Sequence, residues 1–256
     1  MTSRLVSVNI DTAYYFFLFF STIFIYSLHR IVGIEMVGIY RKQGRYKIIK
    51  QYKHHIRVYA IIGLAGAIYY YFKLPYRTCI LLLAPAVISV IYTVPLLPHR
   101  RRIRDFHYIK IILISIVWGL LTVLIPFDTQ LALGANDYLL FIERTLFIFA
   151  ITIPFDIRDE LVDKRSSVKT LIHSLGIKIS KRLALFFILI SFIIYIFLFF
   201  QLHFDWKYII AIFISYSLSS VLIIKANADN SDYYFSGLLD GTMILLLIGF
   251  LAAEII

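Results

Sequence analysis

Three aspartates with helical spacing are the residues of this sequence most able to do chemistry. Asp156, Asp159 and Asp163 come directly after a long apolar run. On a helix that turns about 100° per residue they fall at about 0°, 300° and 340°, which is one narrow face. Carboxylates on one face repel one another unless a cation lies among them, and Mg²⁺ takes oxygen ligands together with phosphate oxygens. Two interpretations stay open at this point: a metal–diphosphate site at a membrane surface, or a solvated loop of mixed charge.

Basic residues follow the aspartates and extend the same chemistry. A diphosphate that departs from carbon gains negative charge, which Lys, Arg and Mg²⁺ can neutralise. Lys169 and Lys164 are the predicted catalytic cations, with Arg158 as a third. Arg158 points to a different helix face from Asp156, so an alternative is that it anchors the segment to lipid phosphates. Lys164 is equally consistent with an ordinary positive charge on the inner side of a membrane.

The composition places these residues in a helical membrane protein. Hydrophobic residues make up 61% of the chain and charged residues only 16%, which excludes an ordinary soluble domain. Several apolar runs reach the roughly 20 residues needed to cross about 30 Å of hydrocarbon. We predict an all-α fold, a polytopic transmembrane bundle of about eight helices that forms a single domain over residues 1–256. The predicted spans are 13–28, 58–72, 78–97, 109–127, 138–155, 183–200, 208–224 and 234–255.

The basic residues indicate how the bundle is oriented. Of the 26 Lys and Arg residues, 21 fall in connections on one side of the predicted bundle, and such loops face the cytoplasm. We therefore expect an integral protein of the cell (inner) membrane, with both termini outside and the acidic stretch on the cytoplasmic face. The net charge of +11 follows from this asymmetry and from contact with membrane lipids, so nucleic acid is not a predicted partner.

The acidic stretch resembles a motif of a known enzyme family. Asp156-x-x-Asp159-x-x-x-Asp163 is followed by Lys169-Thr170-Leu171 and then by Leu175-Gly176. The combined pattern, about one tenth of the chain, is similar to the second aspartate-rich motif of the UbiA-type intramembrane prenyltransferases. In that family the motif also follows a transmembrane helix and leads through a Lys/Arg-Thr-Leu segment to Leu-Gly.

The resemblance implies a UbiA-like fold and a defined reaction. Family members transfer a polyprenyl group from its diphosphate to an acceptor, such as an aromatic ring, haem or a glycerol phosphate. The cofactor implied is Mg²⁺, bound by the three aspartates. The partners implied are a prenyl diphosphate and a lipophilic acceptor, with a lipid-facing tunnel for the prenyl chain. The sequence indicates neither the prenyl length, the acceptor nor the oligomeric state.

The sequence departs from this family near its first predicted span. The family carries a first motif, Asn-Asp-x-x-Asp-x-x-x-Asp, at the cytoplasmic end of an early helix. If Ser27 stands at the asparagine, Ile31 replaces one aspartate and Glu35 replaces the last. The family usually has nine helices, so a count of eight indicates that the first one is absent. The resemblance therefore predicts a divergent member with a degenerate first motif and one helix fewer.

Basic residues stand where the first motif would supply its ligands. His29 and Arg30, with Lys110 at the start of span 109–127, are predicted to bind the phosphate oxygens of the substrate. The alternatives are an interfacial histidine, an arginine that only sets the topology, and a lysine that extends toward lipid headgroups.

Two further acidic residues lie inside predicted spans. Glu143 is followed by Arg144 within span 138–155, and a charge pair inside a membrane is a functional hypothesis by default. Its place near the outer end, far from the three aspartates, favours a structural pair. Asp240 lies about one turn into the last span, where it either lines the same cavity or meets a neighbouring helix.

The principal functional hypothesis is a UbiA-like membrane prenyltransferase that acts with Mg²⁺ assistance. The alternative is a non-catalytic UbiA-like protein that binds an isoprenoid or other phosphorylated lipid, because the first motif is degenerate. A small transporter is the least favoured class, since the sequence has neither an internal repeat nor paired broken helices.

Overall fold

The computed structural model describes most of the chain. The described residues are 10–36, 49, 51–95, 103, 106, 108–128, 133–165, 170–203 and 205–255, with side chains except at 34–36, 128, 161–165 and 254. All regular elements within these residues are helices. The helices form two compact units, of which one spans Asn9–Arg104 and the other consists of Asp105–Ile256 with Met1–Val8.

The first unit contains three helices that pack around α2. They are α2 (Thr12–Met36), α4 (Lys53–Tyr71) and α5 (Tyr76–Thr93). Helix α2 contacts both of the others. The approach of α4 to α2 depends on small residues, because a Cβ atom on Gly66 would lie 2.4 Å from the Phe20 ring. A Cβ atom on Gly63 would lie 2.7 Å from the backbone nitrogen of Phe24.

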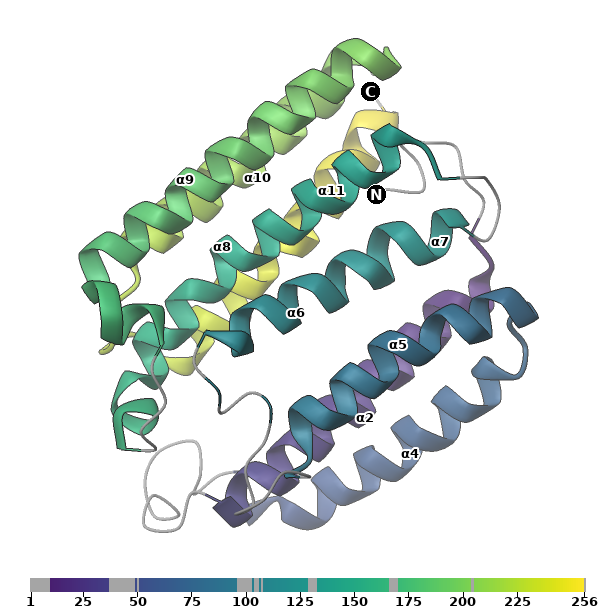
Figure 1. Cartoon of the computed structure of the whole chain (residues 1–256), viewed down its shortest axis with the longest axis vertical. Coiled ribbons are helices and arrows are strands. Elements are labelled where there is room, and N and C mark those ends of the chain that lie inside the picture. The colour runs from purple at the N-terminus through teal and green to yellow at the C-terminus, as the bar shows by residue number, and fades with distance from the viewer. Residues whose placement is uncertain are drawn as a thin grey trace. The chain divides into compact units, whose positions relative to one another are not determined.

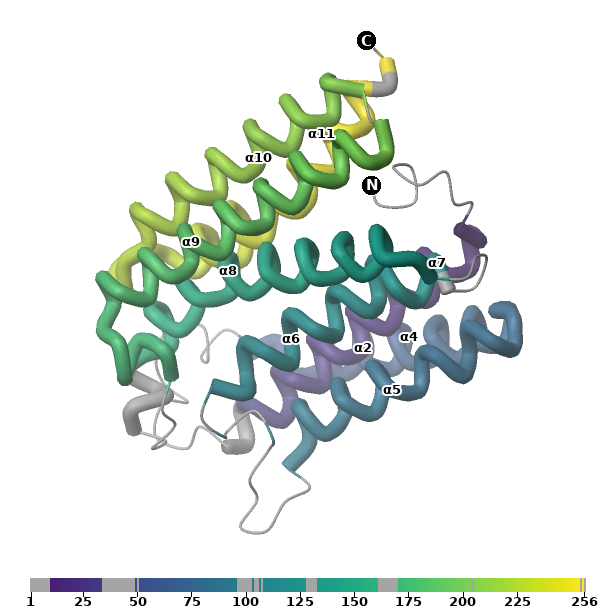
Figure 2. The backbone as a smooth tube through the Cα atoms, turned by 45° about the horizontal axis from the view of Figure 1, so that its top comes forward, coloured from purple at the N-terminus to yellow at the C-terminus, as the bar shows by residue number. Residues whose placement is uncertain are grey.

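The second unit is built around one long helix, α8, which contacts α6, α9 and α10. Helix α6 runs through a π-helical turn, η4, into the short α7, and a second π-helical turn, η5, leads into α11. Figure 1 and Figure 2 show α9 and α10 side by side, and their residues are in contact. The bounds are α6 (Ile109–Gly119), η4 (Leu120–Leu124), α7 (Ile125–Asp128), α8 (Ala135–Arg165), α9 (Leu171–Leu202), α10 (Trp206–Lys225), η5 (Tyr234–Leu239) and α11 (Asp240–Ile255).

The all-α polytopic bundle expected from the sequence is confirmed. Each of the eight predicted spans coincides with a helix, and seven helices in the described part of the chain are long and apolar enough to cross a membrane. The predicted span that is not among these seven is 58–72, which coincides with α4. This helix begins with Lys53, His54 and His55, and its apolar run is interrupted by Gly63 and Gly66. That residues 1–256 form a single domain stays a prediction.

Helix α9 differs most from its predicted limits. It begins at Leu171, whereas the apolar run predicted a span only from residue 183. Thr170 caps it, because its side chain accepts a hydrogen bond from the backbone N–H of His173 at 3.3 Å. The chain bends at Gly176, where φ is +77°, a conformation that glycine adopts without strain. Apolar runs predict the part of a helix that lies in lipid, and α9 continues beyond that part.

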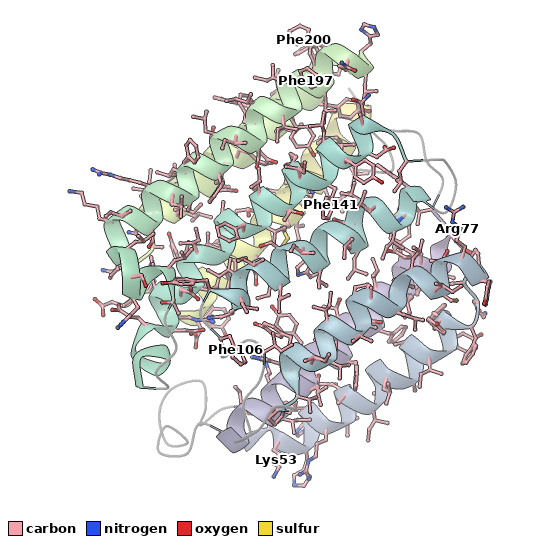
Figure 3. All side chains as sticks on the ribbon, in the orientation of Figure 1. Lys53, Arg77, Phe106, Phe141, Phe197 and Phe200 are labelled. Atoms are coloured by element: carbon pink, nitrogen blue, oxygen red, sulfur yellow. The ribbon has the colours of Figure 1, made fainter. Side chains whose placement is uncertain are left out.

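Large apolar side chains cover the outside of the helices, as contact with hydrocarbon requires. Phe197 and Phe200 of α9 project outward (Figure 3), with 50% and 68% of their surface exposed. With seven helices of suitable length and composition, the chain is an integral membrane protein. The membrane in which it resides and the side on which its acidic stretch lies stay predictions.

A buried polar cluster joins α8 to α9 and α10. The fully buried carboxylate of Glu143 accepts a hydrogen bond from the Tyr216 hydroxyl and lies 3.6 Å from the Arg144 guanidinium. Arg144 donates to the Tyr195 hydroxyl at 2.9 Å. The Ser191 hydroxyl donates to the backbone carbonyl of Glu143 at 3.3 Å. These contacts are made to neighbouring helices, in agreement with a structural role for the charge pair.

Candidate functional site

The acidic stretch continues α8 beyond its apolar run, and Asp156 and Asp159 lie on this helix with the predicted spacing. Asp156 and Asp159 are buried, with 2% and 8% of their surface exposed. They lie about one helical turn apart, which directs both side chains toward the same side of α8. Asp163 belongs to the same helix one turn further on, and its side chain lies outside the described residues.

A lysine from another helix lies between the two carboxylates. Lys110, in the first turn of α6, places its Nζ atom 2.8 Å from Asp156 Oδ1 and 3.6 Å from Asp159 Oδ2. Its side chain is only 10% exposed. Buried carboxylates need a partner of opposite charge, and one ammonium group here serves both. Of the two predicted alternatives for Lys110, the structure places this side chain with the aspartates.

Arg158 binds Asp159 from the same helix. Its Nε atom donates to Asp159 Oδ1 at 2.9 Å, and its Nη2 atom donates to Oδ2 at 3.2 Å. This two-pronged contact fixes the plane of the carboxylate. Sequence position alone argues against it, since adjacent helical residues point in different directions. The long arginine side chain bends back to reach its neighbour.

Further groups around Arg158 come from α8 itself and from the start of the last helix. The guanidinium carbon lies 4.9 Å from the centre of the Phe155 ring and 5.5 Å from that of the Phe235 ring. Asp232, in the connection before η5, places its Oδ1 atom 3.9 Å from Arg158 Nη1. The half-buried Asp240 interacts electrostatically with the same arginine. Of its two predicted alternatives, Asp240 is thus near the aspartate site.

The beginning of α6 is held in place by a contact with α9. Tyr108 adopts a left-handed backbone conformation with φ of 62° immediately before α6. Its hydroxyl shares a hydrogen bond of 2.6 Å with the hydroxyl of Ser174. Because Lys110 is in the first turn of α6, this contact helps to set where the lysine reaches.

Solved structures resemble the fold of this chain closely enough to identify it, although no protein-family model and no curated protein sequence matches the chain. The apo structure of a UbiA homologue from Aeropyrum pernix K1 matches 99% of this chain and 94% of its own, with 13% identity and a TM-score of 0.70. A UbiA homologue from Archaeoglobus fulgidus bound to DMAPP and Mg²⁺ matches 97% and 90%, with 12% identity and a TM-score of 0.63. This chain has a UbiA-type fold.

A third similar structure is that of a digeranylgeranylglyceryl phosphate synthase. It matches 94% of this chain and 84% of its own, with 18% identity and a TM-score of 0.59. These likenesses confirm the UbiA-like fold predicted from the motif. The degenerate first motif and the loss of one helix stay predictions.

The carboxylates of this UbiA-type fold have the right chemistry for Mg²⁺, which prefers oxygen ligands and usually binds through one or two carboxylates plus substrate phosphates. Asp156 and Asp159 supply such oxygens, and Asp163 would supply a third. Within the part of the chain that the structure describes, no three His, Cys, Asp or Glu side chains gather closely enough to hold a metal without the substrate. The oxygens of Asp156 and Asp159 are donors of the type that Mg²⁺ shares with substrate phosphates, and Lys110 Nζ lies at the same oxygens.

The remaining predicted site residues belong to the other unit or lie outside the described part. Lys169 and the side chain of Lys164 are not among the described residues. His29 and Arg30 belong to the other unit, where the His29 ring stacks 6.3 Å from that of Tyr92 and Arg30 is exposed. Their roles in substrate binding stay predictions.

Sequence reasoning missed two groups in this region. Asp232 and Phe235 are far from the motif in sequence and belong to no pattern that indicates a site. The available signal was their place at the start of the last predicted span, Asp232 just before it and Phe235 just inside it, on the side where the acidic stretch was predicted to lie. A π-helical turn is also a frequent feature of functional sites, but it cannot be recognised in the sequence.

Proposed function

We propose that this protein is a membrane prenyltransferase that moves a polyprenyl group from its diphosphate to a lipophilic acceptor with Mg²⁺ assistance. The observation that carries the proposal is the pair of buried carboxylates, Asp156 and Asp159, one turn apart on α8 and bridged by Lys110. Support also comes from the UbiA-type fold, since one similar structure is that of a UbiA homologue bound to DMAPP and Mg²⁺.

The reaction breaks the bond between the allylic carbon and the diphosphate oxygen. The electron pair leaves with the diphosphate, the carbon is captured by a nucleophilic atom of the acceptor, and the acceptor loses a proton. When bound, Mg²⁺ would neutralise the charge that develops on the diphosphate. Asp156, Asp159 and Asp163 would hold the metal.

Cationic side chains would share the task of stabilising the departing diphosphate. Lys110 lies at the carboxylates, so a diphosphate bound through the metal would come within reach of its ammonium group. Lys169 and Lys164 follow the motif in sequence and are proposed as further cations. Arg158 binds Asp159 in the structure, and its direct contact with diphosphate stays a prediction.

The second candidate is a non-catalytic protein that binds an isoprenoid or another phosphorylated lipid. This candidate is motivated by the degenerate first motif and by the pairing of Asp156 and Asp159 with cations of the chain itself, Lys110 and Arg158. The two candidates differ in their products. A Mg²⁺-dependent prenylated product supports the transferase, whereas saturable binding of a prenyl diphosphate without turnover supports the binding protein.

The test uses the full chain reconstituted in lipid vesicles. Labelled prenyl diphosphates of several lengths are combined with aromatic and glycerol phosphate acceptors, with and without Mg²⁺. The Asp156→Asn/Asp159→Asn double variant should lose activity on the order of 100-fold, because the carboxylates that hold the metal are gone. Glu160→Gln is the matched control, since it removes a carboxylate from the same turns of α8 and should retain activity. Full activity in the double variant would refute the metal role.

A further inference from the structure

Arg158 is held on several sides by groups from two separate parts of the chain. Phe155 and Asp159 belong to α8, whereas Phe235 and Asp232 come from η5 and the connection that precedes it. The Arg158 side chain is only 17% exposed. A guanidinium with two carboxylates and two rings around it has little freedom to rotate.

We propose that Asp232 positions Arg158, and that Arg158 in turn positions the carboxylate of Asp159 for the Mg²⁺–diphosphate substrate. Arg158 and Asp232 act as positioning residues in this arrangement, through the carboxylate of Asp159. The inference deepens the proposed function and rests on it.

The two-pronged contact explains why Arg158 can control a metal ligand. An aspartate side chain turns about its last bond readily, so its oxygens point in a fixed direction only when a partner holds them. Arg158 contacts both oxygens of Asp159, at 2.9 and 3.2 Å. Partners of this kind orient metal ligands, and their loss typically weakens metal binding by about 10- to 100-fold.

Asp232 connects this arrangement to the last helix of the fold. It lies in the connection between α10 and α11, and Phe235 follows it in the π-helical turn η5. A change in the position of this connection would move both groups that contact Arg158 from that side. In the proposed arrangement, the connection between α10 and α11 influences the Asp159 carboxylate through Arg158.

The experiment measures Mg²⁺-dependent binding of a non-cleavable thiolodiphosphate analogue of a short prenyl donor. The full chain in detergent micelles is titrated by calorimetry at several Mg²⁺ concentrations, and prenyl transfer is measured in parallel. The variants are Asp232→Asn, Asp232→Glu, Arg158→Lys and the Arg158→Lys/Asp232→Asn double variant. Asp229→Asn is the matched control, because Asp229 is exposed and lies in the same connection.

Simple electrostatics and the proposed arrangement predict opposite signs. Removal of a negative charge near the site should tighten the binding of a polyanion, and both Asp→Asn variants would then behave alike. We expect instead that Asp232→Asn weakens Mg²⁺-dependent binding about 2- to 5-fold, a modest effect because the pair is partly exposed. Asp232→Glu should restore binding. Arg158→Lys should weaken it about 10-fold.

The double variant tests whether the two residues act through one path. If Asp232 acts through Arg158, the Arg158→Lys/Asp232→Asn protein should bind no more weakly than Arg158→Lys alone. Fully additive effects, or equal behaviour of Asp232→Asn and Asp229→Asn, would overturn the proposal while leaving the proposed function intact. If the unmodified chain neither binds the analogue nor forms product, the proposed function itself fails.

Discussion

Replacement of Lys110 by methionine tests the centre of the candidate site. Methionine keeps an unbranched side chain that is one heavy atom shorter, and it removes the charge. In the unmodified protein, the Nζ atom lies 2.8 Å from Asp156 Oδ1 and 3.6 Å from Asp159 Oδ2. In the variant, the buried carboxylate of Asp156 would lose this ammonium group, whereas Asp159 would still be paired with Arg158.

The expected loss of stability follows from the burial of this cluster. The side chain of Lys110 is 10% exposed and that of Asp156 is 2% exposed, so water screens the charges poorly. Removal of one partner from a buried ion pair costs about 3–5 kcal/mol, because the desolvation of the other partner is no longer offset. At about 2 °C per kcal/mol for a chain of this size, the unfolding midpoint should fall by roughly 6–10 °C.

The assay is thermal unfolding of the full chain in detergent micelles, followed by tryptophan fluorescence, in EDTA and in Mg²⁺. Mg²⁺ should raise the midpoint of Lys110→Met more than that of the unmodified chain, since a divalent cation can replace the missing positive charge. Lys110→Met/Asp156→Asn should recover part of the lost stability, because one of the two repelling carboxylates is then neutral. The control is Lys178→Met, which removes the charge of an exposed lysine on α9.

A Lys110→Met midpoint within about 1 °C of the unmodified midpoint in EDTA would refute the bridging role of Lys110. Equal responses of the two proteins to Mg²⁺ would refute the argument that a cation can occupy the place of the ammonium group.

Two other substitutions test the packing inside each of the two units, with the same unfolding assay. Glu143→Gln should destabilise the protein by about 3–5 kcal/mol, because Arg144 then remains buried without its charged partner. Gly66→Ala should destabilise it by about 1–3 kcal/mol, because the added Cβ atom would lie 2.4 Å from the Phe20 ring and force it to move.

Each substitution has a control of the same chemistry. Asp229→Asn also removes an acidic charge, but at an exposed position, and should change stability by less than about 0.5 kcal/mol. A Cβ atom on Gly33 of α2 meets nothing within 4 Å, so Gly33→Ala should stabilise the helix by up to about 1 kcal/mol. The packing argument is wrong if the glycine variants shift stability in the same direction, or if Glu143→Gln is as mild as its control.

The sequence predicted the elements of the fold and one face of the site. Apolar runs of about 20 residues indicate membrane helices because each helix satisfies its own backbone hydrogen bonds in lipid. The spacing of Asp156 and Asp159 predicted a shared helix face because an α-helix turns by a fixed angle per residue, which is also a local property. The sequence also selected Lys110 as a residue able to reach the site, while leaving contact with lipid headgroups as an alternative.

Only the tertiary structure decided which charges meet. Lys110 lies 46 residues from Asp156 in the sequence, and their contact depends on how α6 packs against α8. Asp232 and Phe235 reach Arg158 only because η5 lies against α8, and Arg158 turns back onto Asp159, which helical spacing argues against. Ion pairs between helices are set by packing and side-chain conformation over long sequence separations. Spans and faces are set by local periodicity, and for that reason the sequence alone determined them.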